Sequence, residues 1–370
     1  MARDRLLAAA LPTVAVVALV VVVAAAALSS AAAGTLGFDF LSYDLAVRRF
    51  FAGGVLYDQS FDYTGAFGLF YYPPPFVLLA APLSMVDPAV AAWIWTGFLV
   101  AAFAVAVALL PVDARTRWVI LLLGAISWPL VYAIKLGQVG PILLLTFAAG
   151  WRWMERPWRL GIATAIGTAI KIQPALVFAW ALLTGRRRAV VAGLAVLGIL
   201  TLLATVVAGP SSWVDQATLL ARVSKPIDTP HNMTPGRMAF EAGLPYAAAW
   251  AIQIANWVLV AVVVLIAAFR CRPVASYMAV VVATQLVSPI LWDHYALLLL
   301  LPVAWLLSVG RRWAVLIPLA TSVLLLGLTP SITYPIVFWV ALIAVAREGW
   351  LPSGALHAAR PLASQPPPPR

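Results

Sequence analysis

Long apolar runs dominate the chain, and they constrain its fold more than any other feature. A membrane-crossing helix needs about 20 apolar residues, because each residue rises about 1.5 Å and the hydrocarbon core is about 30 Å thick. The first such run extends from Leu6 to Leu28 and follows two arginines. Further runs occupy residues 73–110, 118–134, 139–151, 160–184, 189–209, 245–269, 273–290, 291–309, 313–329 and 334–346. This hydropathy pattern predicts a multi-pass membrane protein.

The composition excludes the main soluble classes. Apolar residues make up 64% of the 370 residues and charged residues only 10%, whereas an ordinary globular domain has about 25% charged residues. So few charges cannot cover a soluble surface, so a soluble enzyme, a disordered chain and a nucleic-acid binder are all excluded. The runs lack strand alternation, and lipid satisfies no backbone hydrogen bonds. We therefore expect an all-α transmembrane bundle of about ten to twelve membrane segments over residues 1–352, followed by a disordered, Pro-rich cytoplasmic tail at 353–370.

The net charge of +11 comes from small basic clusters between the apolar runs. Such clusters face the cytoplasm under the positive-inside rule, which also places the N-terminus there. The first run is longer than the apolar core of a usual signal peptide, so an uncleaved anchor is favoured over a cleaved signal. The clusters are Arg115/Arg117, Arg152/Arg156/Arg159, Arg186–Arg188, Arg270/Arg272, Arg311/Arg312 and Arg347.

The same rule places the unusual polar segments outside. These include a first external loop at 29–72 and a second at 210–244.

The topology of two segments is left open. The run 73–110 has room for two crossings broken at Asp87-Pro88, while the charge count prefers an odd number. The halves around Lys171 are short for full spans, which is compatible with half-helices lining a cavity.

The lysines Lys135, Lys171 and Lys225 all fall on the predicted outer side. Lysine there opposes the orientation bias, and an ionisable group at membrane depth is costly. Lys135 and Lys171 sit within otherwise apolar runs. Each either extends to the lipid headgroups or faces a polar cavity and binds an anion.

The first external loop contains an amphipathic stretch at residues 40–51. It is expected to form a short interfacial helix, with aromatic residues such as Phe40 and Tyr43 near the lipid surface. Asp39 precedes this stretch. Its carboxylate either caps the helix or serves as a general base at the membrane surface.

A second polar motif, Ser288 to Tyr295, interrupts the apolar last third of the chain. Its aromatic residues alone would suit the interfacial belt. The adjoining Asp293 and His294 favour a site instead, because an imidazole beside a carboxylate can donate to a ligand and polarise it.

Other chemistry finds little support. The single cysteine, Cys271, excludes an intramolecular disulfide, and no Cys/His cluster suggests zinc. No P-loop or dinucleotide-binding motif precedes a helix. The apolar interior lacks the chain of carboxylates expected of an ion-coupled transporter.

On these residues, the chain resembles the bacterial polyprenyl-phosphate-mannose-dependent mannosyltransferases, glycosyltransferase family 87 of the membrane-embedded GT-C superfamily. The resemblance extends over residues 36–300. The matching pieces are Asp39-Phe-Leu-Ser-Tyr43 with Leu56-Tyr-Asp58, Tyr72-Pro-Pro with Ala81-Pro-Leu83, Leu136-Gly-Gln138, Lys171-Ile-Gln-Pro174 and Ser288-Pro-Ile-Leu-Trp-Asp-His294.

The resemblance implies an enzyme of the bacterial plasma membrane with its active site outside. A polyprenyl-phosphate sugar, most simply mannose, would be the donor, and a glycan or glycolipid the acceptor. Asp39 aligns with the family's general base, and His294 with its late external histidine. Lys135, Lys171, Arg48 and Arg49 are expected to bind the donor phosphate. The remaining candidates for the acceptor site or lipid groove are Tyr43, Tyr72, Gln138, Gln173, Trp292, Asp293 and Asn232.

No cofactor is expected. Many related enzymes carry two acids in the first loop, but Phe40 follows Asp39 here, so a divalent metal is not favoured. The alternative function is a transporter or flippase of lipid-linked sugars. It predicts polar residues continuing through the bilayer, whereas the sequence concentrates them at one end.

Overall fold

The computed structural model describes residues 2–62, 66–325, 327 and 331–352. In this part of the chain every regular element is a helix, and the only β-type contact is an isolated bridge between Cys271 and Trp350. The prediction of an all-α, multi-pass membrane bundle is therefore confirmed. The predicted tail at 353–370 lies outside the described residues.

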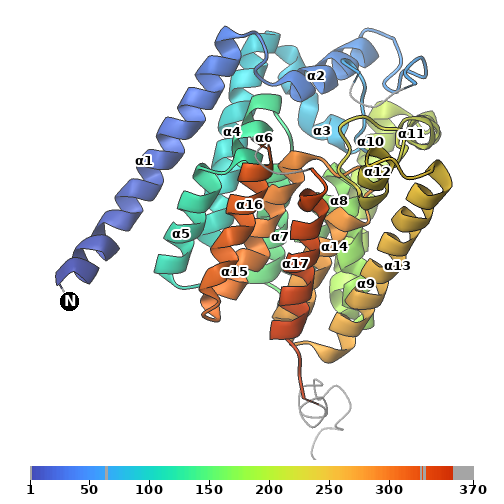
Figure 1. The fold of residues 1–370 in the computed structure, drawn as a ribbon. Coiled ribbons are helices and arrows are strands. Elements are labelled where there is room, and N and C mark those ends of the chain that lie inside the picture. Colours follow the sequence, from blue (N-terminus) through green and yellow to red (C-terminus); the bar gives the residue numbers. More distant parts are fainter. Residues whose placement is uncertain (1, 63–65, 326, 328–330, 353–370) are drawn as a thin grey trace, which may run out of the picture.

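The helices pack side by side with most of their axes roughly parallel (Figure 1). The α-helices are α1 (Ala2–Ala32), α2 (Phe38–Phe51), α3 (Phe76–Ala80), α4 (Pro88–Leu109), α5 (Ala114–Ala125), α6 (Trp128–Leu136), α7 (Gly140–Arg152), α8 (Pro157–Ile170), α9 (Leu176–Leu183), α10 (Arg187–Ala208), α11 (Ser211–Val223), α12 (Pro235–Glu241), α13 (Tyr246–Arg270), α14 (Pro273–Leu286), α15 (Leu300–Ser308), α16 (Leu316–Leu325) and α17 (Thr333–Glu348). The 3-10 helices are η1 (Leu83–Met85), η2 (Gln173–Ala175), η3 (Asp293–Leu299) and η4 (Arg312–Val315).

Among the described residues, four helices are long and apolar enough to cross a membrane alone: Ala10–Ala32 of α1, α4, α10 and α13. The pair α5–α6, bent by 58°, is a fifth candidate if it forms one span. The sequence pattern predicts about ten to twelve membrane segments, which is more than these candidates. The difference arises because polar, Pro or Gly breaks divide several apolar runs into shorter helices such as α8, α9 and α14.

The run 73–110 contains one long helix rather than two. Its first part forms only the short helices α3 and η1, and α4 then begins at Pro88. The Asp87 carboxylate caps α4 by accepting hydrogen bonds from the N–H groups of Ala89 and Val90, at 2.9 and 3.3 Å. Proline suits this first position because no helical partner is needed for its missing N–H. One long helix agrees with the odd number of crossings that the charge count prefers, and the number of crossings stays a prediction.

The break at Lys171 matches the predicted half-helices. Helix α8 ends at Ile170, and the backbone of Lys171 is extended, with φ −150° and ψ 136°. The chain resumes in η2 and the short helix α9. This break lets a charged side chain lie between two apolar helices.

Helices α8 and α10 approach each other through glycines. A Cβ atom at Gly161 would lie 2.3 Å from the carbonyl oxygen of Ala189, and one at Gly193 would lie 2.8 Å from that of Gly161. Small residues at such crossings let membrane helices gain contact without a side-chain clash.

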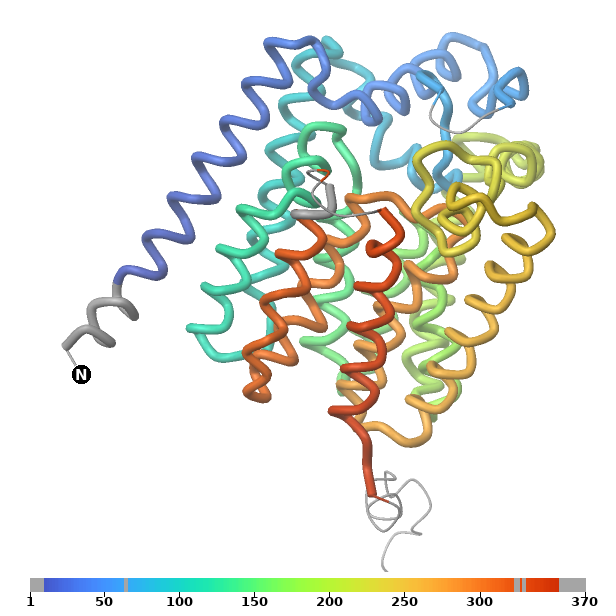
Figure 2. The backbone as a smooth tube through the Cα atoms, viewed as in Figure 1, coloured from blue at the N-terminus to red at the C-terminus, as the bar shows by residue number. Residues whose placement is uncertain are grey.

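The basic clusters lie at one end of the bundle, and α2, α11 and α12 lie at the other (Figure 1). Ion pairs link turns at the basic end: Arg186 with Glu155 at 3.2 Å, and Arg311 with Glu348 at 2.6 Å. The tube in Figure 2 shows α1 inclined away from the other helices, with its N-terminal part toward the basic end. The common side of the clusters thus agrees with the sequence pattern, and its assignment to the cytoplasm stays a prediction.

Candidate active site

Two glycines bring the first external helix against the end of α6. Gly37, before α2, has φ 71°, and Gly137, after α6, has φ 73°. The N–H of Gly37 donates to the carbonyl oxygen of Lys135 at 2.8 Å. A Cβ atom at Gly137 would lie only 2.7 Å from Cβ of Phe40. Glycine in the Leu-Gly-Gln motif therefore permits both the backbone turn and the close approach.

This approach places Asp39 beside Gln138. Helix α2 begins at Phe38, so Gly37 is its N-cap and Asp39 lies within the first turn. The Asp39 carboxylate accepts a hydrogen bond from the side-chain amide of Gln138. The interpretation of Asp39 as a helix cap is thus wrong, because the helix starts one residue before it and no side chain caps this end.

Burial raises the pKa of Asp39, while the Gln138 hydrogen bond and the electrostatic effects of His294 and Lys171 act in the opposite direction. Tyr132 on α6 lies 6.4 Å from the His294 ring, so the helix that ends just before Gln138 also borders the His294 motif. A carboxylate with a raised pKa is a stronger base once it is ionised, which suits proton abstraction.

Gln138 belongs to a buried polar network behind Asp39. Its side chain is only 3% exposed. Its Oε1 accepts a hydrogen bond from the Tyr72 hydroxyl at 3.2 Å, so its amide N–H groups must point the other way, toward Asp39. Tyr43 lies on the same side, with its hydroxyl 3.4 Å from Gln138 Nε2 and its ring 4.6 Å from that of Tyr72. The two tyrosines, expected at the acceptor site or lipid groove, are both buried.

The aromatic face of α2 differs from its predicted lipid exposure. Phe40 is fully buried and stacks on Trp95, with ring centroids 5.0 Å apart. Tyr43 is buried as well, whereas Phe51 at the far end of the helix is 54% exposed. The N-terminal half of α2 is therefore packed into the protein, which keeps Asp39 in a fixed place.

His294 is a buried imidazole without a hydrogen-bond partner among the described residues. It is 3% exposed, and neither ring nitrogen has a partner. Its Nδ1 lies 3.6 Å from Oδ1 of Asp293, beyond hydrogen-bond distance. The surrounding rings belong to Tyr295, Trp292 and Tyr132, with centroids at 4.9, 5.8 and 6.4 Å. Leaving a buried polar group unpaired costs about 1–3 kcal/mol, so this imidazole is a strong candidate for binding a ligand.

The motif around His294 is held by residues that the sequence analysis missed. The indole N–H of Trp128 donates to Asp293 Oδ2 at 3.3 Å. Tyr334, at the start of α17, is fully buried; its hydroxyl donates to the carbonyl oxygen of Asp293 and accepts from the N–H of Ala296 at 3.2 Å. Trp128 lies within the apolar run 118–134 and Tyr334 begins the run 334–346. Tyrosine and tryptophan in such runs look like ordinary belt residues, so no sequence signal distinguishes them.

Lys171 joins the same cluster. Its Nζ donates to the Tyr295 hydroxyl at 2.5 Å and lies 4.0 Å from the centre of that ring. Two residues further on, Gln173 Nε2 donates to Ser288 Oγ at 2.9 Å. The Lys171–Pro174 motif thus contacts the Ser288–Tyr295 motif. The Lys171 ammonium points into the protein and does not extend to the lipid headgroups.

The other predicted phosphate ligands have different surroundings. Lys135 is partly buried in the last turn of α6, and within the described residues its ammonium has no hydrogen bond or ion pair. Arg48 pairs with Asp44 at 2.6 Å and donates to the carbonyl oxygen of Val86. This arginine fastens α2 to the segment before α4.

Arg49 fastens the chain after α2. Its guanidinium donates to the carbonyl oxygen of Val55 at 2.9 Å and lies 3.4 Å from Asp58. It is also ten residues after Asp39, about 15 Å along the helix axis. Lys171 therefore lies beside the His294 motif, while Arg48 and Arg49 have other partners.

Asn232 connects the second external loop to the His294 motif. The predicted loop 210–244 contains α11 and α12. Asn232 is fully buried, and its Nδ2 donates to the carbonyl oxygens of Pro226 and Pro289 at 2.8 and 3.0 Å. Its Oδ1 accepts from the N–H of Leu291 at 2.8 Å. All of these partners are backbone groups. Asn232 therefore holds the backbone of the Ser288–Tyr295 motif in place.

Within the described part of the chain, no three His, Cys, Asp or Glu side chains are grouped to hold a metal ion. The chemical groups that do meet are a carboxylate, an imidazole and an ammonium, surrounded by tyrosine and tryptophan. They lie at the end of a helical membrane bundle. A carboxylate can serve as a base, and an imidazole and an ammonium can donate to a developing anion, which are the groups that a group-transfer reaction needs.

The chain belongs to glycosyltransferase family 87, whose profile matches residues 70–289. One similar protein is the polyprenol-phosphate-mannose-dependent alpha-(1-2)-phosphatidylinositol mannoside mannosyltransferase of Mycobacterium tuberculosis (strain H37Rv), which is 25% identical over 283 residues. That match covers 68% of this chain and 66% of the relative, just under two thirds of its length. No solved structure matches the chain. Family 87 is the family that the sequence motifs indicated.

The family match includes Gln138 and Lys171, whereas Asp39 and His294 lie outside residues 70–289. The structure links the two sets directly, through the Asp39–Gln138 and Lys171–Tyr295 hydrogen bonds. The candidate roles of Asp39 and His294 therefore depend on tertiary position.

Proposed function

We propose that this membrane glycosyltransferase moves mannose from a polyprenyl-phosphate donor to a glycan or glycolipid acceptor on the extracytoplasmic side. One observation carries the proposal: Gln138, which holds Asp39, follows the helix α6 whose Tyr132 borders the buried His294, and Lys171 donates to the adjacent Tyr295. The name of the mycobacterial relative supports this donor and a phosphatidylinositol mannoside as the class of acceptor. The positive-inside rule supports the outer location, because the basic clusters occupy the opposite end.

The proposed reaction is a single displacement. An acceptor hydroxyl oxygen attacks the anomeric carbon while the bond from that carbon to the phosphate oxygen breaks. The bonding electrons leave with polyprenyl phosphate, and the hydroxyl proton passes to Asp39. One displacement without a glycosyl-enzyme intermediate inverts the configuration at this carbon.

The leaving phosphate needs nearby donors and positive charge. Lys171 and His294 supply them in this proposal, with Lys135 as a further cation at the end of α6. Arg48 and Arg49 are assigned to holding α2, because their guanidinium groups already have protein partners. Trp292 and Gln173 are partly exposed beside the cluster and are assigned to the groove. This scheme uses no metal or cofactor.

A transfer assay tests the proposed function. Purified protein in detergent is given radiolabelled polyprenyl-phosphate mannose with a phosphatidylinositol mannoside, and product is separated by thin-layer chromatography. We expect labelled glycolipid, at least about tenfold more than with the arabinose or glucose donor, because a site that hydrogen-bonds sugar hydroxyls rejects an analogue that misplaces them. Movement of the donor across proteoliposomes without any transfer would instead identify a flippase.

Gln138 is proposed as the residue that positions the base. Replacing it with leucine removes the amide that donates to Asp39 and lowers its pKa. The Asp39 pKa should then rise further. Because the base acts when ionised, the acid limb of the kcat/KM profile should move to higher pH, and the maximal rate should fall about tenfold or more.

A matched control is Gln253→Leu. Gln253 is also fully buried, but its Oε1 accepts from the N–H of Gly236. This change should lower the melting temperature without moving the pH profile. Equal profiles for both variants would reduce Gln138 to a packing role.

A further inference from the structure

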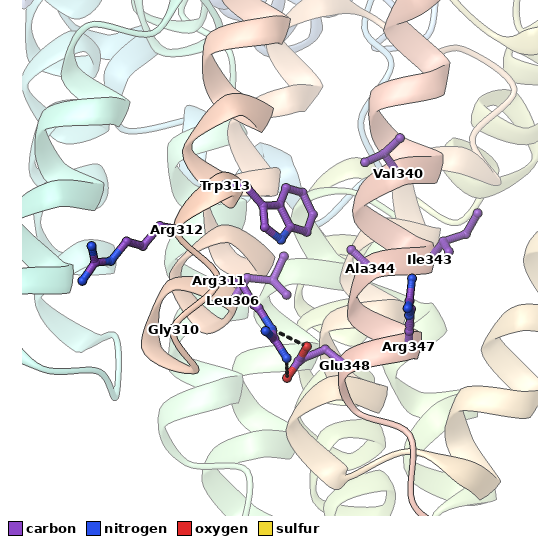
Figure 3. Close-up of a pocket in the computed structure, with 10 residues that line it drawn as sticks. All are labelled: Leu306, Gly310, Arg311, Arg312, Trp313, Val340, Ile343, Ala344, Arg347 and Glu348. Carbon is purple, nitrogen blue, oxygen red and sulfur yellow. Dashed lines mark hydrogen bonds and ion pairs between the residues drawn. The ribbon is translucent and has the colours of Figure 1, made fainter.

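A second polar site lies at the basic end of the bundle, opposite Asp39. It is a pocket of about 730 Å³ between α15, the following turn and α17 (Figure 3). This volume is within the range of about 300–1,000 Å³ typical of small-molecule sites. The lining residues are Leu306, Gly310, Arg311, Arg312, Trp313, Val340, Ile343, Ala344, Arg347 and Glu348.

One wall of the pocket is apolar and open to the surroundings. Val340 and Ile343 on α17 are 45% and 55% exposed, and Trp313 on the facing side is 43% exposed. In a membrane protein, such exposed apolar residues on a helix contact lipid chains. Tryptophan prefers the headgroup level, where its apolar ring and its N–H group both find suitable surroundings. The pocket therefore lies where acyl chains meet headgroups.

The other side of the pocket carries an excess of positive charge. Arg311 forms two hydrogen bonds with Glu348, at 2.6 and 3.1 Å. Arg347 stands on α17, and Arg312 on the opposite flank points away from the other lining side chains (Figure 3). Within the described residues their guanidinium groups have no hydrogen bond or ion pair. One carboxylate thus balances one of three guanidinium groups, and two positive charges remain uncompensated.

We propose that this pocket binds an anionic phospholipid. Its phosphate is held by Arg347, since a guanidinium group matches phosphate oxygens in geometry and charge, and Arg312 adds positive charge from the opposite flank. An acyl chain lies along Val340 and Ile343. The apolar wall selects a lipid over a soluble phosphate, because a free ion gains nothing from that surface. Basic pockets between membrane helices recognise lipid headgroups in this way.

Native mass spectrometry of the full-length protein tests the proposal. Protein in neutral detergent is titrated with phosphatidylglycerol or phosphatidylcholine. We expect one saturable phosphatidylglycerol, bound about tenfold more weakly after the double change Arg312→Gln and Arg347→Gln. The matched control is Arg187→Gln with Arg188→Gln, two exposed arginines at the same end that do not line the pocket. Their loss should leave the bound lipid unchanged.

A second variant keeps the charge and fills the space. Ala344→Phe should also displace the lipid, which decides the matter if the double arginine variant misfolds. Equal weakening by the control pair would overturn the proposal in favour of diffuse attraction to the basic end. Equal binding of phosphatidylcholine, or displacement by an equimolar amount of inorganic phosphate, would overturn it too. The readout is binding, so it does not depend on the proposed transfer reaction.

Discussion

Changing Asp39 to asparagine should reduce the proposed mannosyl transfer by about 10³-fold, within the range of roughly 10²–10⁴ for loss of a general base. The asparagine keeps the size of the side chain and an oxygen that can accept from Gln138, but it cannot take the acceptor proton. The loss should therefore appear in kcat with little change in KM for the donor. Single-turnover measurements with the labelled donor separate these terms.

The same change should leave the fold intact or stabilise it. Burial raises the pKa of Asp39 in the folded protein, so at neutral pH, which is above the unfolded pKa, the unfolded state holds the ionised carboxylate more readily and this disfavours the folded state. That penalty disappears as the pH falls below the unfolded value, and asparagine removes it at every pH. Melting of the variant at pH 7 should thus occur at an equal or higher temperature than that of the parent protein.

The control for Asp39 is Asp58→Asn in the same external loop. Asp58 pairs with Arg49 at 3.4 Å on a partly exposed surface, where such pairs contribute little. Its loss should change transfer less than about twofold. If Asp39→Asn retained full activity, the base would have to be another group.

Replacing His294 with leucine should reduce transfer by about 10²–10³-fold, comparable to the loss of one preorganised donor to a developing anion. Leucine fills much of the space and removes two ring nitrogens that have no partner within the described residues. The free energy of unfolding should therefore stay unchanged or rise, since an unpaired buried polar group is destabilising. Activity and stability would move in opposite directions.

Tyr334→Phe gives the contrasting result for a structural residue. The Tyr334 hydroxyl bonds the backbone around His294, so its removal should destabilise the protein by about 1 kcal/mol. Activity should fall only to the extent that the backbone around His294 shifts. If His294→Leu lowered the melting temperature as much as Tyr334→Phe, the imidazole would be a packing residue.

Hydropathy and charge alone predicted much of this protein. Runs of apolar residues required helices, because lipid leaves backbone groups unpaired in any other local structure. The basic clusters predicted that the turns carrying Arg186, Arg311 and Arg347 share one end, and they do (Figure 1). The break at Lys171 was also visible, because a charge and a proline interrupt an apolar stretch.

Two interpretations from the sequence differ from the structure. One placed the start of a helix too late, and the other could not foresee how a side chain packs. Asp39 looked like a cap because a polar residue before an amphipathic stretch usually is one. Gly37 took that position, since it adopts the left-handed conformation that the approach to Gly137 requires. Asn232 looked like a groove residue but is buried against backbone groups.

The sequence by itself determined a helical membrane protein whose scarce polar residues are concentrated in a few motifs. It could do so because burial in lipid depends on the length of the apolar runs and on the spacing of polar residues within them. Only the tertiary structure decided which of those residues meet. Asp39 reaches Gln138, and Lys171 reaches Tyr295, across 99 and 124 residues of chain. Such contacts follow from helix packing and close glycine approaches, which no local pattern encodes. The same packing left the ring nitrogens of His294 without a hydrogen-bond partner among the described residues, while it gave Arg48 and Arg49 partners of their own.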